Sequence, residues 1–240
     1  VKNVSYNNGE ITFDTADTFK EGNAVIAAKD ASGNILWSWH IWLTDEPQGQ
    51  EYYNNAGTMM DRNLGATSAT PGDVGALGLL YQWGRKDPFL GSSRISSSIE
   101  AKSTITWPAT QMSSSNGTIE YATTHPTTFI TYNSKNNDWY YTGTSISDNT
   151  RWTTAESDKS VYDPCPTGWR VPGRGGKNVW SAALNSFSDF YRKYDSANEG
   201  MNFSGKLGSD EIIWYPASGS RSYGGGQLDD VGHGGYYWSA

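Results

Sequence analysis

The sequence is poor in the residues that build disulfides and metal sites. Its 240 residues include one cysteine, Cys165, and three histidines. A lone cysteine cannot form an internal disulfide, and zinc takes about four nitrogen or sulfur ligands held close together. Cys165 lies between two prolines with no histidine beside it in the sequence, so we interpret it as a buried thiol or as half of a lost disulfide. We therefore expect no metal and no cofactor.

The chain also lacks cationic blocks and long apolar runs. Its net charge is −7, and the charges are spread along the sequence. Nucleic acids and anionic membranes attract a basic face, so neither is an expected partner. No stretch is apolar enough to insert into a bilayer. No signal peptide is visible and the sequence begins at Val1, so we expect a processed or truncated product.

Aromatic residues and glycine are abundant instead. The chain carries 11 Trp, 15 Tyr and 27 Gly, and long stretches are rich in Ser, Thr and Asn. Rings bury a large area per residue, so few aliphatic residues are needed for a core. This composition favours many short strands and long ordered loops over helix bundles.

The N-terminal segment predicts two hairpins. Residues 4–13 alternate weakly around the turn signal Asn7-Asn8-Gly9. Strands are expected at 24–29 and 35–43, joined by a turn at 30–34. The second of these strands is aromatic on both faces, which is typical of a strand that is central or covered on both sides. Residues 1–45 are either the end of a preceding β domain or the first sheet of this one.

The rest of the chain offers shorter signals. Residues 77–83 fit a helix or a strand equally well. Trp169 and Val171 are expected on one face of a short strand, followed by one clear amphipathic helix at about 178–194, whose apolar face includes Trp180 and Tyr194. We interpret Trp169, as an anchor at the joint, and Trp238 as core residues. Further short strands are expected at 103–107, 128–132, 139–141, 212–215 and from 236 to 240.

Four segments appear in an order that is typical of one family. They are Met60-Asp61-Arg62-Asn63-Leu64, Leu80-Tyr81-Gln82-Trp83, Cys165-Pro166-Thr167-Gly168-Trp169-Arg170-Val171-Pro172, and Gly219-Ser220-Arg221 with Tyr236-Tyr237-Trp238-Ser239-Ala240. Together they resemble the Fibrobacter major paralogous domain family, which has a C-type-lectin-like fold. The resemblance covers roughly residues 35–240, without most of 91–160.

The resemblance implies a fold, a location and a partner. It implies an α+β fold, a C-type-lectin-like domain over 46–240 with short antiparallel sheets, one helix and long ordered loops. The family normally continues beyond Tyr-Trp-Ser with further strands and a second cysteine, so we expect a truncated C-terminus. Similar domains of Bacteroides-type bacteria form fimbrial tip subunits and surface lipoproteins. Lectin calcium motifs are matched only in part, at Glu46-Pro47-Gln48, and in the wrong part of the chain.

Two groups of residues are candidates for ligand binding. The first lies in the long polar region and comprises Asn137, Asp138, Trp139, Tyr140, Arg151 and Trp152. Its rings could stack on a sugar while its polar groups bond the hydroxyls, or the rings could anchor a long loop. The second lies among glycines and comprises Tyr223, Asp229 and Asp230, near His233. It is either a ligand or cation site or ordinary turn chemistry.

These observations predict an extracellular, adhesin-like binding module at a fimbrial tip or on the outer membrane, with no catalytic residues. Its partners would be glycans, host or bacterial surface proteins, and neighbouring pilus subunits. One alternative is a structural pilus subunit or cap, which would use the hairpin at 24–43 for strand addition. Another is a carbohydrate-active enzyme, for which adjacent carboxylates such as Asp210-Glu211 are a poor pair, because neighbours in a strand point to opposite faces.

Overall fold

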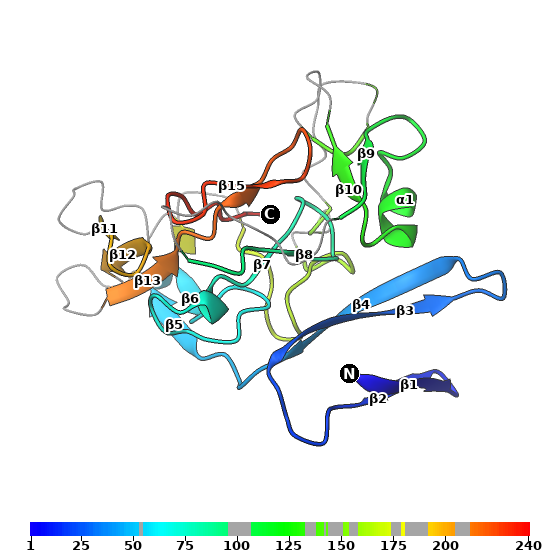
Figure 1. The fold of residues 1–240 in the computed structure, drawn as a ribbon, viewed down its shortest axis with the longest axis horizontal. Coiled ribbons are helices and arrows are strands. Elements are labelled where there is room, and N and C mark those ends of the chain that lie inside the picture. Colours follow the sequence, from blue (N-terminus) through cyan, green and yellow to red (C-terminus); the bar gives the residue numbers. More distant parts are fainter. Residues whose placement is uncertain are drawn as a thin grey trace.

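A computed structural model describes residues 1–52, 55–95, 107–132, 138–141, 143, 151–153, 158–173, 179–180, 192–204 and 212–240. Within these ranges the chain forms short strands, most of them in antiparallel pairs, and one α-helix of six residues (Figure 1). The described part is therefore of the α+β class with little helix, and the many short strands agree with the prediction from the composition.

The N-terminal hairpin forms where the sequence predicts it. Strands β1 (Lys2–Asn7) and β2 (Glu10–Asp14) pair antiparallel. Asn8 and Gly9 connect them, with φ angles of 50° and 89°. Positive φ at both central residues is the requirement of a type I′ turn, which suits asparagine followed by glycine. The hairpin is mostly exposed to solvent.

The second hairpin is also confirmed. Strands β3 (Gly22–Lys29) and β4 (Ile35–Leu43) pair antiparallel, and Asp30 closes the turn by accepting hydrogen bonds from the backbone N–H groups of Ser32 and Asn34. Strand β4 is not central, because among the described residues it pairs with β3 alone, and it is not covered on both faces along its whole length, because Leu36 is exposed. Its rings contact loops instead of strands: Trp37, for example, packs on Tyr162.

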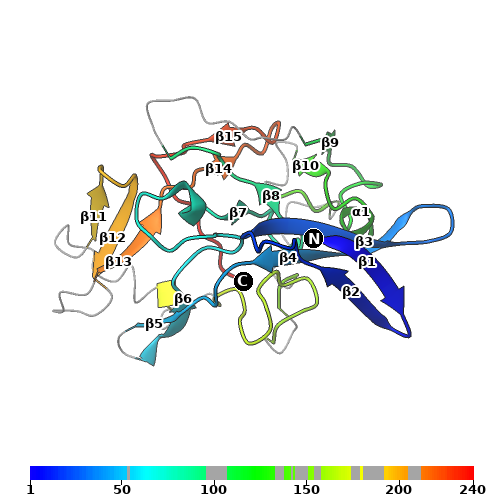
Figure 2. The ribbon, with the colours of Figure 1, turned by 60° about the horizontal axis from the view of Figure 1, so that its bottom comes forward.

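Buried polar contacts join β4 to the rest of the molecule. The Ser38 hydroxyl donates to Asp87 at 2.6 Å, and Lys86 pairs with the same carboxylate at 2.9 Å. The indole of Trp42 donates to the carbonyl oxygen of Ala66 at 2.9 Å. Figure 2 shows β3 and β4 running alongside the central segments. The hairpin is therefore part of the body that carries the site.

The remaining elements are small. Four two-stranded sheets are formed by β5 (Gly49–Tyr52) with β6 (Gly57–Met60), β7 (Leu79–Leu80) with β8 (Phe89–Leu90), β9 (Ala109–Gln111) with β10 (Phe129–Thr131), and β14 (Ser220–Arg221) with β15 (Leu228–Asp229). Only the β9–β10 pair is parallel among these four. A three-stranded antiparallel sheet contains β11 (Arg192–Asp195), β12 (Gly200–Ser204) and β13 (Ile212–Pro216). The helices are the 3₁₀ turn η2 (Val74–Ala76) and α1 (Ile119–Thr124), which lies against β4.

The helix expected at about 178–194 does not extend to its predicted end. Val179 and Trp180 have helical backbone, residues 181–191 lie outside the described part, and residues 192–195 form strand β11. Tyr194, which we counted on the apolar helix face, is instead paired with Met201 of β12. Aromatic residues fit a half-buried strand as well as a helix, and the neighbouring strand decides between them.

Helix α1 was not predicted from the sequence. It begins at Thr118, whose side chain accepts a hydrogen bond from the backbone N–H of Tyr121 at 3.0 Å. This is an ordinary N-cap. The helix has only six residues, so its apolar positions are too few to give a periodic signal.

Several short strands were predicted with mixed success. Strands β10 and β13 confirm the predictions at 128–132 and 212–215, and residues 79–80 of the 77–83 segment form strand β7. No strand forms at 139–141, at 169–171 or at 236–240, so those three predictions are wrong. The prediction at 103–107 lies almost wholly outside the described residues.

Around residue 169, a carboxylate accepts backbone hydrogen bonds that a partner strand would otherwise accept. Asp163 accepts hydrogen bonds from the backbone N–H groups of Cys165 and Val171, each at 2.8 Å. These donors would otherwise need a strand ladder, so the segment is held extended without one. Trp169, which we expected as a buried anchor, is only half-buried.

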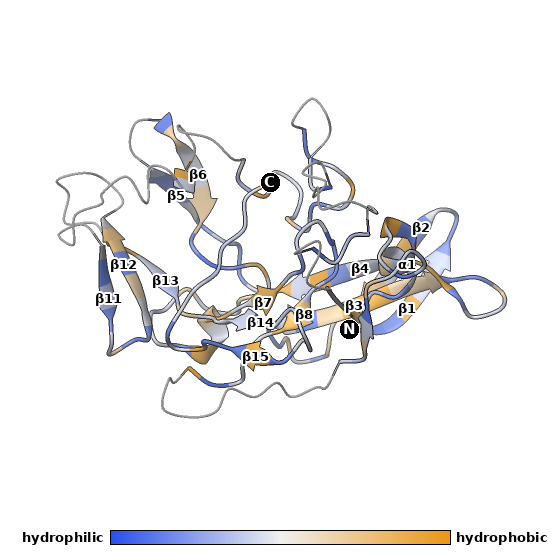
Figure 3. Ribbon diagram, turned by 90° about the horizontal axis from the view of Figure 1, so that it is seen from above, coloured by the Kyte–Doolittle hydropathy of each residue, from blue (hydrophilic) through white to orange (hydrophobic). Residues whose placement is uncertain are grey.

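The core is divided into two clusters. One comprises Tyr52, Val179, Ile213 and Tyr215. The other comprises Met112, Ala122, Ile130 and Trp139. Figure 3 shows that hydrophobic residues occur in short pieces of chain, among them β7 and β8 near the centre. A cavity lies among these pieces.

Candidate functional site

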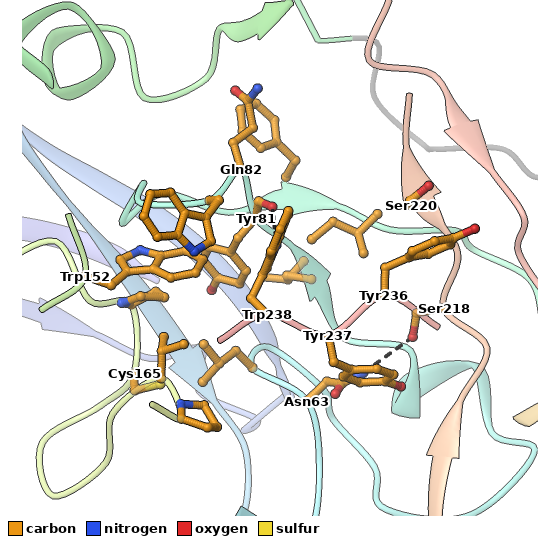
Figure 4. Close-up of a pocket in the computed structure, with 18 of the residues that line it drawn as sticks. Asn63, Tyr81, Gln82, Trp152, Cys165, Ser218, Ser220, Tyr236, Tyr237 and Trp238 are labelled. Atoms are coloured by element: carbon orange, nitrogen blue, oxygen red, sulfur yellow. Dashed lines mark hydrogen bonds between the residues drawn. The ribbon is translucent and has the colours of Figure 1, made fainter. Parts of the chain in front are cut away.

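A cavity of about 550 Å³ opens in the body of the protein and is lined by residues from both core clusters. Its wall is built from six stretches of chain that are far apart in the sequence, lying within 58–64, 79–89, 129–152, 164–180, 218–223 and 236–238. Figure 4 shows that rings from several of these stretches face one another across it. Its volume falls in the range of pockets that hold a small organic ligand.

Indole groups fix the C-terminal segment as one part of this wall. The Trp83 indole donates to the carbonyl oxygen of Ser239 at 2.9 Å, and the Trp180 indole donates to that of Trp238 at 3.1 Å. Trp238 in turn donates to the carbonyl oxygen of Tyr81 at 3.0 Å. These indole donors, together with a backbone hydrogen bond from Ala240 to Pro172, hold residues 236–240 in place without a strand partner among the described residues.

The cavity has one polar corner. Asn63 donates to the hydroxyl of Ser218 at 3.4 Å and to the carbonyl oxygen of Leu77 at 3.2 Å (Figure 4). The hydroxyl of Tyr237 donates to the carbonyl oxygen of Pro216 at 2.6 Å. Burial raises the pKa of Tyr237, so this hydroxyl is neutral at physiological pH. The corner offers amide and hydroxyl groups without a charge.

Cys165 lies on the wall as a neutral thiol. Burial raises its pKa, and the nearby carboxylate of Asp163 raises it further. A nucleophilic cysteine needs a lowered pKa, so the environment argues against thiolate chemistry at this position.

The structure brings most of the first predicted group together, with its rings facing inward. Trp139 and Trp152 are 4% and 1% exposed. Their indoles donate to the carbonyl oxygens of Trp83 at 2.6 Å and Arg85 at 3.1 Å. These two rings therefore help to build the cavity wall and the core, and they do not form an open surface platform.

The guanidinium of Arg151 fills the centre of this group. It lies 4.3, 4.9 and 5.0 Å from the ring centroids of Trp83, Trp139 and Tyr140. Its Nη2 donates to Asp138 at 2.7 Å in an ion pair whose side chains are 2% and 9% exposed. The cation is thus enclosed by rings and one carboxylate. Asn137 lies outside the described residues.

The second predicted group lies at the surface. Tyr223, Asp229 and Asp230 are exposed, and so is His233. Tyr223 contacts Tyr132, with ring centroids 4.2 Å apart. Asp230 accepts a hydrogen bond from the hydroxyl of Tyr236. Among the described residues, no group of three or more His, Cys, Asp or Glu side chains is placed to hold a metal ion.

Sequence reasoning missed the residues that border the opening. Tyr223, Tyr236 and Trp238 line the cavity and are 63%, 56% and 48% exposed; we call these three residues the aromatic rim. Only Tyr223 was predicted. Tyr236 and Trp238 belong to the Tyr-Tyr-Trp run, which we had assigned to a strand and, for Trp238, to the core. The sequence signal that could have revealed them is the unbroken aromatic run Tyr236-Tyr237-Trp238, which directly follows a glycine-rich loop.

The described residues contain no helix that is long and apolar enough to span a membrane. Comparisons of the chain with protein-family models, with curated proteins and with solved structures found no match.

Proposed function

We propose that this protein is a non-catalytic, cell-surface binding module that recognises glycans at the aromatic rim. The observation that carries the proposal is the rim itself: three exposed rings border a cavity of about 550 Å³. Aromatic rings pack on the apolar face of a pyranose, and a pre-formed site avoids the entropic cost of ordering loops. Asp229 and Asp230 lie beside the rim as hydrogen-bond acceptors for sugar hydroxyls.

The family resemblance supports the same conclusion. Residues of all four resemblance segments line the same cavity, although up to about 180 positions separate them: Met60, Tyr81, Cys165, Ser220 and Trp238 are examples. Motif segments that are distant in the sequence but line the same cavity are more consistent with one shared site than with separate local turns. We therefore propose a C-type-lectin-like domain of the Fibrobacter major paralogous family, displayed at a fimbrial tip or on the outer membrane.

Glycan arrays test this function, followed by titration calorimetry on any hit. We expect Tyr223→Ala and Tyr236→Ala each to weaken binding by about tenfold, equivalent to about 1.4 kcal/mol. Tyr6→Ala is the matched control, because Tyr6 is an exposed tyrosine of the N-terminal strand β1 and is not among the cavity-lining residues. A folded protein that binds no glycan on the array, or rim variants that bind as well as the wild type, would contradict the proposal.

A structural role is the second candidate, and the β3–β4 pair favours it. Within the described residues each of these strands has one neighbour, which leaves the outer edge of the pair without a strand. Such edges pair readily with another chain. Val25→Lys places a charge on β3, where Val25 is exposed, and would reduce co-assembly with a neighbouring subunit while leaving glycan binding intact. Unchanged assembly would exclude this role.

A further inference from the structure

The interior of the cavity, below the aromatic rim, has a different chemistry from the rim. Protein interiors are close-packed, with few voids larger than a water molecule. A space of about 550 Å³ is large enough for a small organic ligand. The interior therefore has space for a ligand of its own, separate from any ligand that the exposed rings bind.

Most of the interior wall is apolar. Leu79 and Leu80 of β7 contribute to it, together with Phe129 and Ile130 of β10 and the ring of Trp152. Phe129, Ile130 and Trp152 are almost fully buried and pack behind the surface, so the half-buried Leu79 and Leu80 present more of the apolar wall to the cavity. Water in contact with such a wall gains few hydrogen bonds, so displacing it by apolar groups is favourable.

Charged side chains on the wall are already engaged by the protein. Arg62 binds Asp45 and Asp61, at 2.5 and 2.9 Å. Asp138 is paired with Arg151. Arg221 donates to the carbonyl oxygens of Leu90 and Gly226. Arg170, which also lines the cavity, has a contact of its own within the protein. Each charged group on the described wall therefore already has a protein partner and Cys165 is neutral, so a charged ligand would lose its hydration and would have to displace one of these contacts to find a counter-charge.

Uncharged hydrogen-bonding groups gather on one side. Figure 4 shows Asn63, Ser218 and Ser220 on the side of Tyr236 and Tyr237, and Trp152 and Cys165 on the other side. Among the described residues, the Ser220 hydroxyl makes no hydrogen bond to another side chain or to the backbone, so it is available to a ligand. The cavity thus has an apolar side and a hydroxyl-bearing side.

We propose that the cavity binds a neutral, mainly apolar small molecule, such as one with an aryl or acyl group, oriented by a hydrogen bond to Ser220. The apolar part lies toward Trp152, and the polar end lies toward Ser220 and Asn63. The proposal does not rest on glycan binding at the rim, because its ligand carries no sugar.

The test uses N-phenyl-1-naphthylamine, a neutral aromatic amine whose fluorescence rises in apolar surroundings. We expect saturable binding at one site by the wild type. Ser220→Trp places a ring inside the cavity and should weaken binding at least tenfold, and Ser220→Leu, a smaller filling change, should weaken it less. Ser5→Trp is the matched control, because Ser5 lies on the exposed strand β1, and it should bind as the wild type does. Near-ultraviolet circular dichroism checks the fold of each variant.

Four results would overturn the proposal. The first is the absence of saturable binding by the folded wild type. The second is equal affinity of the wild type and both folded Ser220 variants, which would place the dye elsewhere. The third is equally tight binding of the anionic analogue 8-anilino-1-naphthalenesulfonate, because a wall that selects neutral ligands should bind it at least tenfold more weakly. If the protein instead dimerises and dye binding is lost with dimerisation, a second copy covers the cavity and the small-molecule assignment is wrong.

Discussion

Ser38 and Asp87 are 49 positions apart and share a buried hydrogen bond of 2.6 Å. Lys86 completes the contact by donating to both residues, and its side chain and that of Asp87 are 8% and 4% exposed. This contact joins strand β4 to the segment between β7 and β8, which contributes Tyr81, Gln82 and Trp83 to the cavity wall. This buried contact is therefore one of those that join the hairpin to the cavity wall.

Removing the carboxylate of this pair should destabilise the protein strongly. Asp87→Ala leaves the ammonium group of Lys86 buried without its counter-charge, which costs roughly 3–5 kcal/mol. Asp17→Ala is the matched control, because it breaks an exposed Lys–Asp pair with Lys2 and should cost at most about 1 kcal/mol. Urea unfolding of both variants measures the difference. Equal free energies of unfolding would show that the buried pair contributes no more than the exposed one.

The protein should lose stability in mild acid because of His40. Burial lowers the pKa of His40 to about 4, and its ring nitrogens contact Asn23 and, more distantly, Tyr81. His40 takes up a proton near pH 6.5 in the unfolded chain but only near pH 4 in the native state. The contribution of His40 to the free energy of unfolding is therefore fully present above pH 6.5 and is lost as the pH falls toward 4. The loss is on the order of 3 kcal/mol at most. His40→Gln should flatten this part of the stability–pH curve in urea melts, and an unchanged slope would disprove the role of His40.

Gly219 should not tolerate a side chain. Its φ is 70°, and an added Cβ would collide with the backbone oxygen of Asp229 and the side chain of Val231. Gly219→Ala should therefore cost more than about 2 kcal/mol and disturb the β14–β15 pair. Gly224→Ala is the control, because only the Ser222 hydroxyl lies near that position, at 4.0 Å. Thermal melts that shift equally for the two variants would contradict the predicted clash.

Trp152 should behave as a core residue. Trp152→Ala removes a ring that is 1% exposed, together with its hydrogen bond to Arg85, and should cost roughly 3–5 kcal/mol. Trp39→Ala, at a residue that is 37% exposed, should cost clearly less. Chemical denaturation gives both values. A Trp152→Ala protein of native stability that loses only ligand binding would favour the original sugar-platform hypothesis for this residue.

Short-range signals allowed part of the fold to be predicted. Asn8-Gly9 and Asp30–Asn34 determine their hairpins through turn chemistry within a few residues, and Pro216 ends β13 where expected. Prediction failed where a distant group decides the outcome. Val171 is extended because of Asp163, and residues 236–240 are extended because of indoles at positions 83 and 180.

The candidate site was harder to predict for the same reason. Trp139 and Arg151 lie in a polar region of the sequence. In the structure they are buried next to Trp83, which is more than 50 positions away. No local pattern distinguishes a ring that faces a cavity from one that faces solvent. The role of Tyr236 and Trp238 in the rim required knowledge of which segments meet.

The close packing of three indoles gives the protein an internal optical reporter. Trp152 lies between Trp83 and Trp238, with ring centroids 5.7 and 6.3 Å away and at steep angles. The electronic transition dipoles of rings at this distance and inclination couple to one another. The native state should therefore show a split band in the near-ultraviolet circular dichroism spectrum. That band would disappear if the rings lost their fixed geometry while the strands remained. Disorder of the cavity wall could then be followed without a label, in the same sample used for binding.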